Sequence, residues 1–361
     1  MSRRIAVTLT TINLPIVIEK LIAQDISSGD SLEIVIIGDL KTPPGTSEYL
    51  NNLQPVSPEI IIRYMDIDEQ KQRFSKYEAL WELLPLNSFS RRNYADLYCL
   101  DEKIDYVIRI DDDNFPIENN FILEHIKALE LEEVSLISDS LGWFNICSLL
   151  LESSGKEFYP RGFPYPYRDK YSNSKNIVSK VKIGINAGLW LGDPDVDAIT
   201  RLVLAPKVIG INKNNLMSHI ALDKGTWSPI NTQNTSYRGE ILQISFVSPH
   251  VGRYDDIFCG YIARSILDRL NIQTSYGLPL VFQDRNKHDL WDDEKLERFG
   301  NTSGVEIIDF IKHYEYKNEQ LLACYEEINS ALDKEFSRKY DEIKKMCLGI
   351  YAWISAVEKV I

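Results

Sequence analysis

Between residues 5 and 110, short apolar runs alternate with segments that have the spacing of amphipathic helices. The apolar runs cover residues 5–9, 31–37, 59–64 and 105–110, and the helix-like segments cover residues 15–22 and 91–100. Short apolar strands that alternate with helices are typical of parallel sheets with right-handed crossover connections. The pattern therefore predicts an α/β fold in which helices flank a mostly parallel sheet.

Polar residues follow each of these predicted strands at its carboxyl end. Thr10, Asp39 and Asp66 follow the first three strands, and an aspartate triplet at 111–113 follows the fourth. In sheets of this kind, ligands bind outside the carboxyl ends of the strands. We therefore expect these residues to lie along one edge of the sheet and to line a ligand pocket.

The pattern changes after about residue 141. Aromatic residues, prolines and glycines cluster over 159–168, a strand is predicted over 181–191, and a helix is predicted to open near residue 252 and to end near residue 270. From residue 305 onward the sequence is charged and helix-periodic. We expect a ligand-binding domain over residues 1–300 and a helical C-terminal extension over residues 301–361, which is a candidate element for homo-oligomerisation.

Composition and charge narrow the classes of function. The chain has 361 residues, of which 44% are hydrophobic and 26% are charged, and this balance is typical of a globular protein. Its formal net charge is -13 at pH 7. A protein that binds nucleic acid needs a basic surface to neutralise phosphates, so we expect no nucleic-acid partner.

The spacing of the cysteines and the length of the apolar segments indicate in which cellular compartment the protein is expected. The five cysteines are widely scattered, which indicates reduced thiols and not a disulfide framework. The apolar stretch over residues 346–357 is too short to cross a bilayer, and the N-terminus lacks the pattern of a secretory signal. We expect a cytoplasmic protein without a transmembrane segment. The C-terminal helix that contains Trp353 fits packing against the body or, alternatively, contact with a membrane surface.

The aspartate triplet is the most informative short segment. Mg²⁺ and Mn²⁺ prefer carboxylate oxygens and take one or two protein carboxylates together with substrate phosphates. The pattern predicts that Asp111 and Asp113 bind a divalent metal ion, Mn²⁺ or Mg²⁺, and that Asp112 binds substrate. The alternative is a solvated acidic turn that caps a helix. Upstream, Arg92 is a candidate to bind phosphate or to position the triplet, or it marks a solvated helix start.

Several blocks, in order along the chain, resemble one protein family. The blocks are IDDD at 110–113, RGFPYPYR at 161–168, GLWLGDPDVDA at 188–198, KGT at 224–226, GRYDDIFCG at 252–260 and GLPLV at 277–281. The ordered set resembles the reversibly glycosylated polypeptides, a family that includes the plant UDP-arabinopyranose mutases. The resemblance runs from about residue 5 to residue 300.

The resemblance implies a glycosyltransferase-A-type fold and an enzyme that uses UDP-sugars and a divalent metal ion. Thr10, Asp39 and Asp66 would then line the nucleotide pocket. The family can carry a reversibly attached sugar on an arginine, and Arg168 matches that arginine by its place after the run Gly-Phe-Pro-Tyr-Pro, which makes it a candidate catalytic residue. Because a guanidinium is a poor nucleophile, an ordinary phosphate-binding or ion-paired arginine is the alternative.

The chain departs from the family pattern after the Gly-Leu-Pro segment. Plant members carry a histidine there, whereas this chain has Gln283 and a later histidine, His288. We hypothesise that His288 is the third protein ligand of the metal ion, the alternative being a solvated surface histidine. The departures indicate a distant member whose sugar need not be arabinose.

Four further residues of the matching blocks are candidates for the site. Trp190 packs on the sugar or, alternatively, belongs to the core. Asp255 and Asp256 lie at a predicted helix start, where backbone N–H groups lower the pKa of carboxylates. One of them is a candidate catalytic base or ligand of sugar hydroxyls, or both are simple helix caps. Arg253 beside them is a candidate phosphate ligand.

The sequence thus predicts a metal-dependent enzyme that cleaves the anomeric C–O bond of a UDP-sugar, with mutase or self-glycosylating activity. A glycosyltransferase that passes the sugar to a separate glycan or lipid-linked acceptor shares the same machinery and remains an alternative. The third alternative is a non-catalytic subunit that binds nucleotide sugars and assembles through its C-terminal helices.

Overall fold

The computed structural model describes residues 2–170, 173–213 and 218–361. Its described strands form one mixed sheet with the main order β3-β2-β1-β4-β12-β9-β13-β11-β6-β8. The strands are β1 (Arg4–Thr10), β2 (Ser31–Ile37), β3 (Ile60–Met65), β4 (Tyr106–Ile110), β5 (Asn114–Pro116), β6 (Glu133–Asp139), β7 (Leu150–Glu152), β8 (Ser174–Lys180), β9 (Lys182–Gly192), β10 (Val208–Ile211), β11 (Ile220–Leu222), β12 (Asn234–Arg238) and β13 (Ile272–Gln283).

The N-terminal half of the sheet is parallel, as the sequence pattern predicts. Strands β1, β2, β3 and β4 pair in parallel, and the register aligns Thr10, Ile37 and Met65 at their carboxyl ends. Every side chain of β4 is buried, as expected for a parallel strand covered on both faces. The strand predicted over residues 31–37 is confirmed, and the other three differ from the prediction by one residue at their ends.

The C-terminal half of the sheet adds antiparallel pairing that the sequence pattern does not predict. Strand β12 lies antiparallel between β4 and β9 and joins the two halves. Strand β9, which corresponds to the strand predicted over residues 181–191, pairs in parallel with β13. The sheet is therefore mixed, and its parallel N-terminal half carries the strand ends that the sequence singles out.

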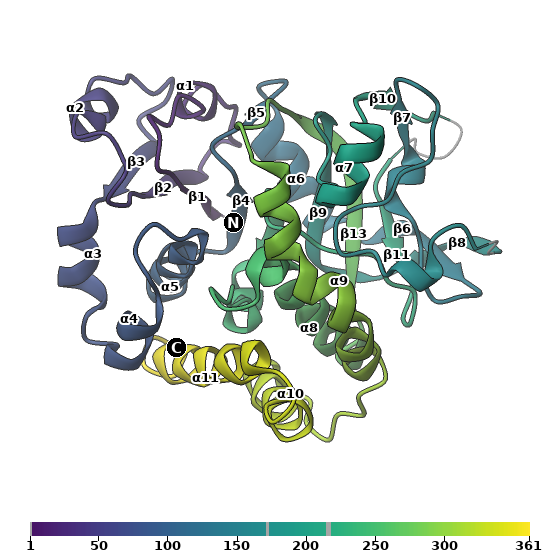
Figure 1. The fold of residues 1–361 in the computed structure, drawn as a ribbon. Helices are drawn as coiled ribbons and strands as arrows, with labels where there is room; N and C mark the ends of the chain where they lie inside the picture. The colour runs from purple at the N-terminus through teal and green to yellow at the C-terminus, as the bar shows by residue number, and fades with distance from the viewer. Residues whose placement is uncertain (1, 171–172, 214–217) are drawn as a thin grey trace.

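Helices cover the sheet and close the molecule at the C-terminus (Figure 1). The helices are α1 (Ile18–Leu21), α2 (Thr46–Asn51), α3 (Ile67–Phe74), α4 (Glu78–Leu83), α5 (Arg92–Asp101), α6 (Phe121–Glu130), α7 (Ala198–Leu204), α8 (Asp255–Arg269), α9 (Leu290–Lys312), α10 (Leu321–Phe336) and α11 (Asp341–Val357). The helix predicted over residues 15–22 is reduced to α1, because the N–H groups of Ile18 and Glu19 bond carbonyls three residues back in tight turns.

The C-terminal helices pack on the body of the protein. Helix α11 contacts α4 and α5, and α10 contacts α8 (Figure 1). Trp353 of α11 is fully buried, and its indole N–H donates to the carbonyl of Gln243 at 2.9 Å. Of the two alternatives for this helix, the first therefore holds: its apolar face packs against the body of the protein. None of the helices in the described part of the chain is long and apolar enough to cross a membrane.

The structure bears on two further expectations, one about the cysteines and one about the C-terminal region. All five cysteines are buried free thiols, as expected. Helix α9 begins at Leu290 and runs without a break past residue 300, so it belongs to both of the expected segments, 1–300 and 301–361. Oligomerisation through the C-terminal helices stays a prediction.

Candidate active site

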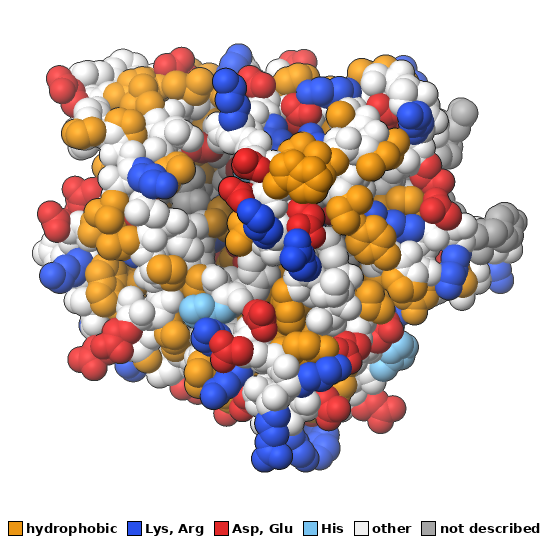
Figure 2. Space-filling model, in the orientation of Figure 1, with side chains coloured by type: hydrophobic (Ala, Val, Ile, Leu, Met, Phe, Trp, Pro, Cys, Tyr) orange, Lys and Arg blue, Asp and Glu red, His pale blue; other side chains and the backbone are white. Residues whose placement is uncertain are grey.

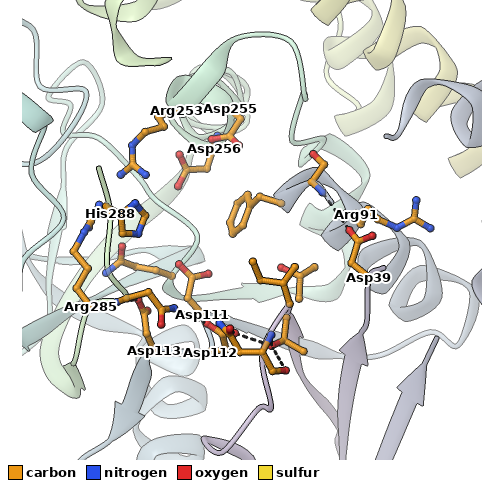
Figure 3. A pocket seen from close by; sticks show the side chains of 18 of the residues that line it. Asp39, Arg91, Asp111, Asp112, Asp113, Arg253, Asp255, Asp256, Arg285 and His288 are labelled. Atoms are coloured by element: carbon orange, nitrogen blue, oxygen red, sulfur yellow. Dashed lines mark hydrogen bonds between the residues drawn. The ribbon is translucent and has the colours of Figure 1, made fainter. Parts of the chain in front are cut away.

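A cavity of about 600 Å³ lies at the carboxyl ends of β1, β2 and β4. It is closed on the other side by the segment that opens α8 and by the segment between β13 and α9 (Figure 3). Acidic and basic side chains also gather near the first turns of α9 on the molecular surface (Figure 2). Nine of the residues that the sequence singles out line the cavity: Thr10, Asp39, Asp111, Asp112, Asp113, Arg253, Asp255, Asp256 and His288.

Asp111 is held in place from behind the cavity by Arg92. The buried guanidinium of Arg92 donates to the Oδ1 atom of Asp111 at 2.7 Å and to the carbonyl of Thr232 at 2.9 Å. It also lies 3.7 Å from the centre of the Phe89 ring. Arg92 is not among the residues that line the cavity. Its contacts are those of a residue that positions the aspartate triplet, which is one of the two functions that the sequence leaves open.

The other two aspartates are fixed by the segments on either side. Asp112 accepts a hydrogen bond from the hydroxyl of Thr11 at 2.7 Å and one from the side-chain amide of Asn286 at 3.2 Å. Asp113 accepts from the backbone N–H of Asn286 at 3.0 Å and from the side chain of Asn114 at 2.9 Å. The triplet is therefore a built part of the cavity and not a solvated acidic turn.

The carboxylates of the triplet are short of compensating positive charge. Burial raises the pKa of Asp111 to about 7, and the carboxylates of Asp113, Asp112 and Asp256 add to the shift although Arg92 opposes it. Burial also raises the pKa of Asp113. A cavity wall with crowded carboxylates has the electrostatic character of a cation site. The donor set fits a hard divalent cation that takes one or two protein carboxylates and completes its shell with ligand oxygens.

The structure does not assemble the three-residue ligand set expected of Asp111, Asp113 and His288. Within the described residues, no group of three or more histidine, cysteine, aspartate or glutamate side chains is close enough to hold a metal ion. The imidazole of His288 lies 3.3 Å from the carboxylate of Asp293 in α9 and faces that partner. One oxygen of Asp113 is meanwhile taken by the backbone N–H of Asn286.

Opposite the triplet, a buried arginine joins two carboxylates. Arg161 makes bidentate contacts to Asp195 at 3.0 Å and to Asp256 at 3.0 and 3.2 Å, and it also donates to the backbone carbonyl of Arg253. Against the effect of burial, Arg161 lowers the pKa of Asp195 to about 2. The five N–H groups of the guanidinium are thus all directed to protein acceptors.

The pKa of Asp255, at the start of α8, is shifted in the opposite direction to that of Asp195. Burial and the neighbouring charge of Asp256 raise the pKa of Asp255 to about 7. From the sequence, the helix start is expected to lower the pKa of these carboxylates, and for Asp255 that expectation is wrong. Burial and the like charge outweigh the hydrogen bond that its Oδ1 atom accepts from the backbone N–H of Asp256 at 2.9 Å.

Besides Arg92, three residues that the sequence assigns to the site do not line the cavity. Asp66 is exposed and caps α3, accepting from the N–H of Glu69 at 2.9 Å. Trp190 of β9 is 2% exposed and belongs to the core. Arg168 pairs with Asp197 at 2.8 Å, and its guanidinium lies 3.8 Å from the centre of the Tyr165 ring.

Residues that the sequence analysis does not assign also line the cavity. Arg161, Asp195 and Arg285 contribute charge, while Gln283 lies with Gln233 behind the triplet, joined by a hydrogen bond of 2.8 Å. Arg161 opens the same aromatic block that ends in Arg168, so the block itself was a usable signal. Nothing in the local pattern around Arg285 separates it from the neighbouring charged residues of a loop.

Comparisons with known sequences identify one family. The model of the reversibly glycosylated polypeptide family matches residues 70–361, which includes the C-terminal helices beyond the blocks that carry the resemblance. UDP-arabinopyranose mutase 2 of Arabidopsis thaliana is 25% identical over 263 residues, covering 71% of this chain and 69% of that protein. UDP-arabinopyranose mutase 1 of Oryza sativa subsp. japonica is 24% identical over 263 residues, covering 71% and 68%.

Among solved structures, the chain is similar at low scores to a synthase and a mannosyltransferase. Glucosyl-3-phosphoglycerate synthase of Mycobacterium tuberculosis, solved with Mg²⁺ and UDP, has a TM-score of 0.39 at 13% identity and covers 86% of this chain and 79% of its own. A mannosyltransferase of Pyrobaculum calidifontis, solved with GDP-mannose and Mn²⁺, has a TM-score of 0.42 at 11% identity and covers 99% and 87%. The α/β architecture expected from the sequence is confirmed by the chain's own elements, with helices on a mixed sheet and a helical C-terminus.

Proposed function

Because the chain belongs to the reversibly glycosylated polypeptide family, we propose that it is an enzyme that binds a UDP-sugar, cleaves the bond between the anomeric carbon and the diphosphate, and returns the sugar in another ring form. The curated relatives are named UDP-arabinopyranose mutases, which supports this choice over transfer to a separate acceptor. One observation carries the proposal. A single cavity at the strand ends holds crowded carboxylates on one side and a buried Arg161 between two carboxylates on the other.

The nucleotide lies, in this proposal, along the ends of β1 and β2. The carboxylate of Asp39 accepts from the backbone N–H of Leu40 at 2.8 Å and from that of Ser88 at 3.2 Å. These bonds fix the carboxylate at the cavity wall (Figure 3), where its remaining lone pairs accept from the N–H of a base or the hydroxyl of a ribose. Thr10 lines the same side of the cavity.

Asp111 and Asp113 are the residues that would hold a divalent cation. When bound, such an ion supplies positive charge that stabilises the diphosphate as a leaving group. Arg92 fixes the orientation of Asp111, and Asn286 fixes that of Asp113. The cation is thus proposed with two protein carboxylates, and His288 is left outside its ligand set.

The proposed reaction is an isomerisation in which the bonds formed balance the bonds broken. The C1–O bond to the β-phosphate breaks, and its electron pair stays on the phosphate oxygen. The sugar remains in the cavity; for a pyranose that becomes a furanose, the ring oxygen leaves C1, the oxygen of the C4 hydroxyl bonds to C1 in its place, and the proton of that hydroxyl passes to the former ring oxygen. The C1 atom is then bonded again to an oxygen of the same phosphate. No proton is gained or lost over the cycle, and no co-reactant is needed. Water must be kept from C1, which favours an enclosed site.

Of the two arginines in the aromatic block, Arg161 is the one that faces the cavity. Formation of a C1–N bond requires the guanidinium to give up a proton, because the charged form is a poor nucleophile. Asp195 and Asp256 contact every nitrogen of Arg161 and, against the effect of burial, raise its pKa well above the usual value, so Arg161 stays charged and holds these two carboxylates in place. If the sugar is held on an arginine during the cycle, Arg168 is the candidate that the family resemblance gives.

The proposal is tested by incubating the purified protein with Mn²⁺ and a panel of UDP- and GDP-linked sugars. Nucleotide products are separated by chromatography, and the intact mass of the protein is measured in parallel. We expect a new isomer of one UDP-sugar without release of free UDP. Variants Asp111→Asn and Asp113→Asn should lose this conversion, whereas Asp66→Asn, outside the cavity, should keep it.

Other outcomes point to the other functions. Release of UDP without an isomer indicates a glycosyltransferase that lacks its acceptor. Binding without any conversion favours the non-catalytic subunit, and absence of both conversion and binding for the whole panel contradicts the enzymatic proposal. A mass gain of one sugar that disappears in Arg168→Lys supports attachment at Arg168, and a mass gain that persists in that variant excludes it.

A further inference from the structure

A second charged wall of the cavity is built around one carboxylate of α9. Asp293, in the first turns of α9, is 6% exposed and lies close to three basic side chains of the cavity. Its distances are 3.3 Å to His288, 3.4 Å to Arg253 and 3.7 Å to Arg285. Arg285 and His288 come from the segment between β13 and α9, Arg253 comes from the segment before α8, and Asp293 is the partner that all three share.

Arg285 is the member of this cluster whose hydrogen-bonding capacity is least used. Its side chain is 10% exposed and lines the cavity, yet its Nε atom is buried with no hydrogen-bond partner among the described residues. Its ion pair with Asp293 is long, at 3.7 Å. A buried guanidinium with free donors is costly unless a ligand completes its bonding.

Arg285 is also the least compensated cation of the cluster, since its one ion pair among the described residues is the long one with Asp293. Burial lowers the pKa of Arg285, and the like charges of Arg201 and Arg253 add to the shift. Arg253 is better compensated, since its Nε atom donates to Glu297 at 3.0 Å, but part of its guanidinium remains open to the cavity. Arg161, by contrast, has no N–H group left for a ligand, because all five are directed to protein acceptors.

We propose that Arg285 and Arg253 bind the diphosphate of the nucleotide ligand and that Asp293 is a positioning residue that holds both guanidinium groups at the cavity wall. This inference rests on the proposed function, because it names the part of that cavity that takes the diphosphate. It assigns the anion-binding donors to the C-terminal half of the chain and makes the first turns of α9 part of the site. Bidentate arginine donors match the geometry of phosphate oxygens.

The test is a series of binding measurements with uridine, UMP and UDP by isothermal titration calorimetry, in Mg²⁺ and again in EDTA. For the wild-type protein, affinity should increase along the series. In Arg285→Gln, the affinity for UDP should fall about 10- to 100-fold, the factor that one lost charge-assisted hydrogen bond gives, while uridine binding is unchanged. Arg298→Gln is the matched control, because Arg298 lies in the neighbouring helix α9, is exposed and pairs with Glu294.

The variant Asp293→Asn separates positioning from simple neutralisation. If Asp293 positions the two arginines, its loss weakens UDP binding without changing uridine binding, and Asp293→Glu restores part of the affinity. If it only neutralises them, its loss makes the cavity more positive and strengthens UDP binding. Thermal unfolding of each variant establishes that the fold is intact.

The outcomes distinguish this inference from the proposed function. If the wild-type protein binds neither uridine nor UDP, the proposed function fails. If it binds UDP better than uridine and Arg285→Gln keeps that ratio, the proposed function stands and the assignment of Arg285 is overturned. Stronger UDP binding by Asp293→Asn overturns the positioning role.

Discussion

The carboxylate side of the cavity comes from three consecutive residues after one strand, whereas the basic side is assembled from residues at the ends of three different elements. Asp111, Asp112 and Asp113 follow β4 directly, and β4 lies in the middle of the sheet. Arg253 precedes α8, Arg285 follows β13, and Asp293 lies in α9. The first arrangement needs only a strand that ends in the right place. The second exists only when three elements dock together, so we expect it to respond more strongly to changes in packing.

The largest expected effect concerns the buried ion pairs that Arg161 makes in the cavity wall. Replacing Arg161 by Gln leaves Asp195 and Asp256 buried without their partner, and breaking a buried pair in this way costs about 3–5 kcal/mol. We expect a loss of this size in the free energy of unfolding, measured by urea denaturation at pH 7. The exposed pair of Arg298 and Glu294 provides the control, since Arg298→Gln should cost less than about 1 kcal/mol. Equal losses in the two variants would contradict the account of Arg161.

A smaller effect, on catalysis, is expected when one carboxylate of the aspartate triplet is neutralised. Asp111→Asn keeps the shape of the side chain but removes the charge proposed to hold the cation, and loss of one such electrostatic contact lowers turnover about 100- to 1000-fold. The measurement is the initial rate of conversion of the UDP-sugar at saturating substrate. A variant with unchanged turnover would show that the triplet is a structural turn.

The pH dependence of stability gives a third test, on Asp255. Because its folded-state pKa, about 7, lies above the usual value, the protonated form stabilises the fold at low pH, and this contribution is lost as pH increases from about 4 to about 7. Asp255→Asn should therefore be more stable than the wild type at pH 8, and the difference should shrink towards pH 4. Denaturation curves at several pH values measure it. A difference that does not change with pH would contradict the raised pKa.

The smallest expected effect is outside the cavity. Asp66→Ala removes the N-cap of α3 and should cost about 0.5–2 kcal/mol of stability while the affinity for UDP is unchanged. Chemical denaturation and calorimetry give the two values. A loss of UDP affinity without a loss of stability would return Asp66 to the nucleotide pocket that the sequence analysis assigns to it.

The same contrast explains how far the sequence predicts the fold and the site. The parallel strands and the triplet are signalled by local apolar runs that end in polar residues, so Asp39 and Asp111 could be placed at the cavity from sequence alone. The antiparallel insertion of β12 between β4 and β9 depends on contacts between residues far apart in the chain, which periodicity does not record.

The site residues that the sequence misplaces or misses likewise depend on contacts that form only in the folded chain. Arg168 and Arg161 stand at the two ends of one block, and only the folded chain directs Arg161 to the cavity while Arg168 pairs with Asp197. His288 carries a plausible metal-ligand side chain, yet α9 supplies Asp293 as its partner. Arg285 gives no local signal, because its significance depends on burial and on an unpaired Nε atom.

The central claim is that the cavity breaks the anomeric C–O bond of a UDP-sugar reversibly and retains the sugar. It is tested most directly by positional isotope exchange, with a UDP-sugar that carries ¹⁸O in the bridge between C1 and the β-phosphate. After incubation with the protein and Mn²⁺, the recovered UDP-sugar is analysed by ³¹P NMR. The account predicts that ¹⁸O moves from the bridge to the non-bridging positions without release of free UDP, and that Asp111→Asn prevents this. Recovery of bound substrate with all ¹⁸O still in the bridge would contradict it.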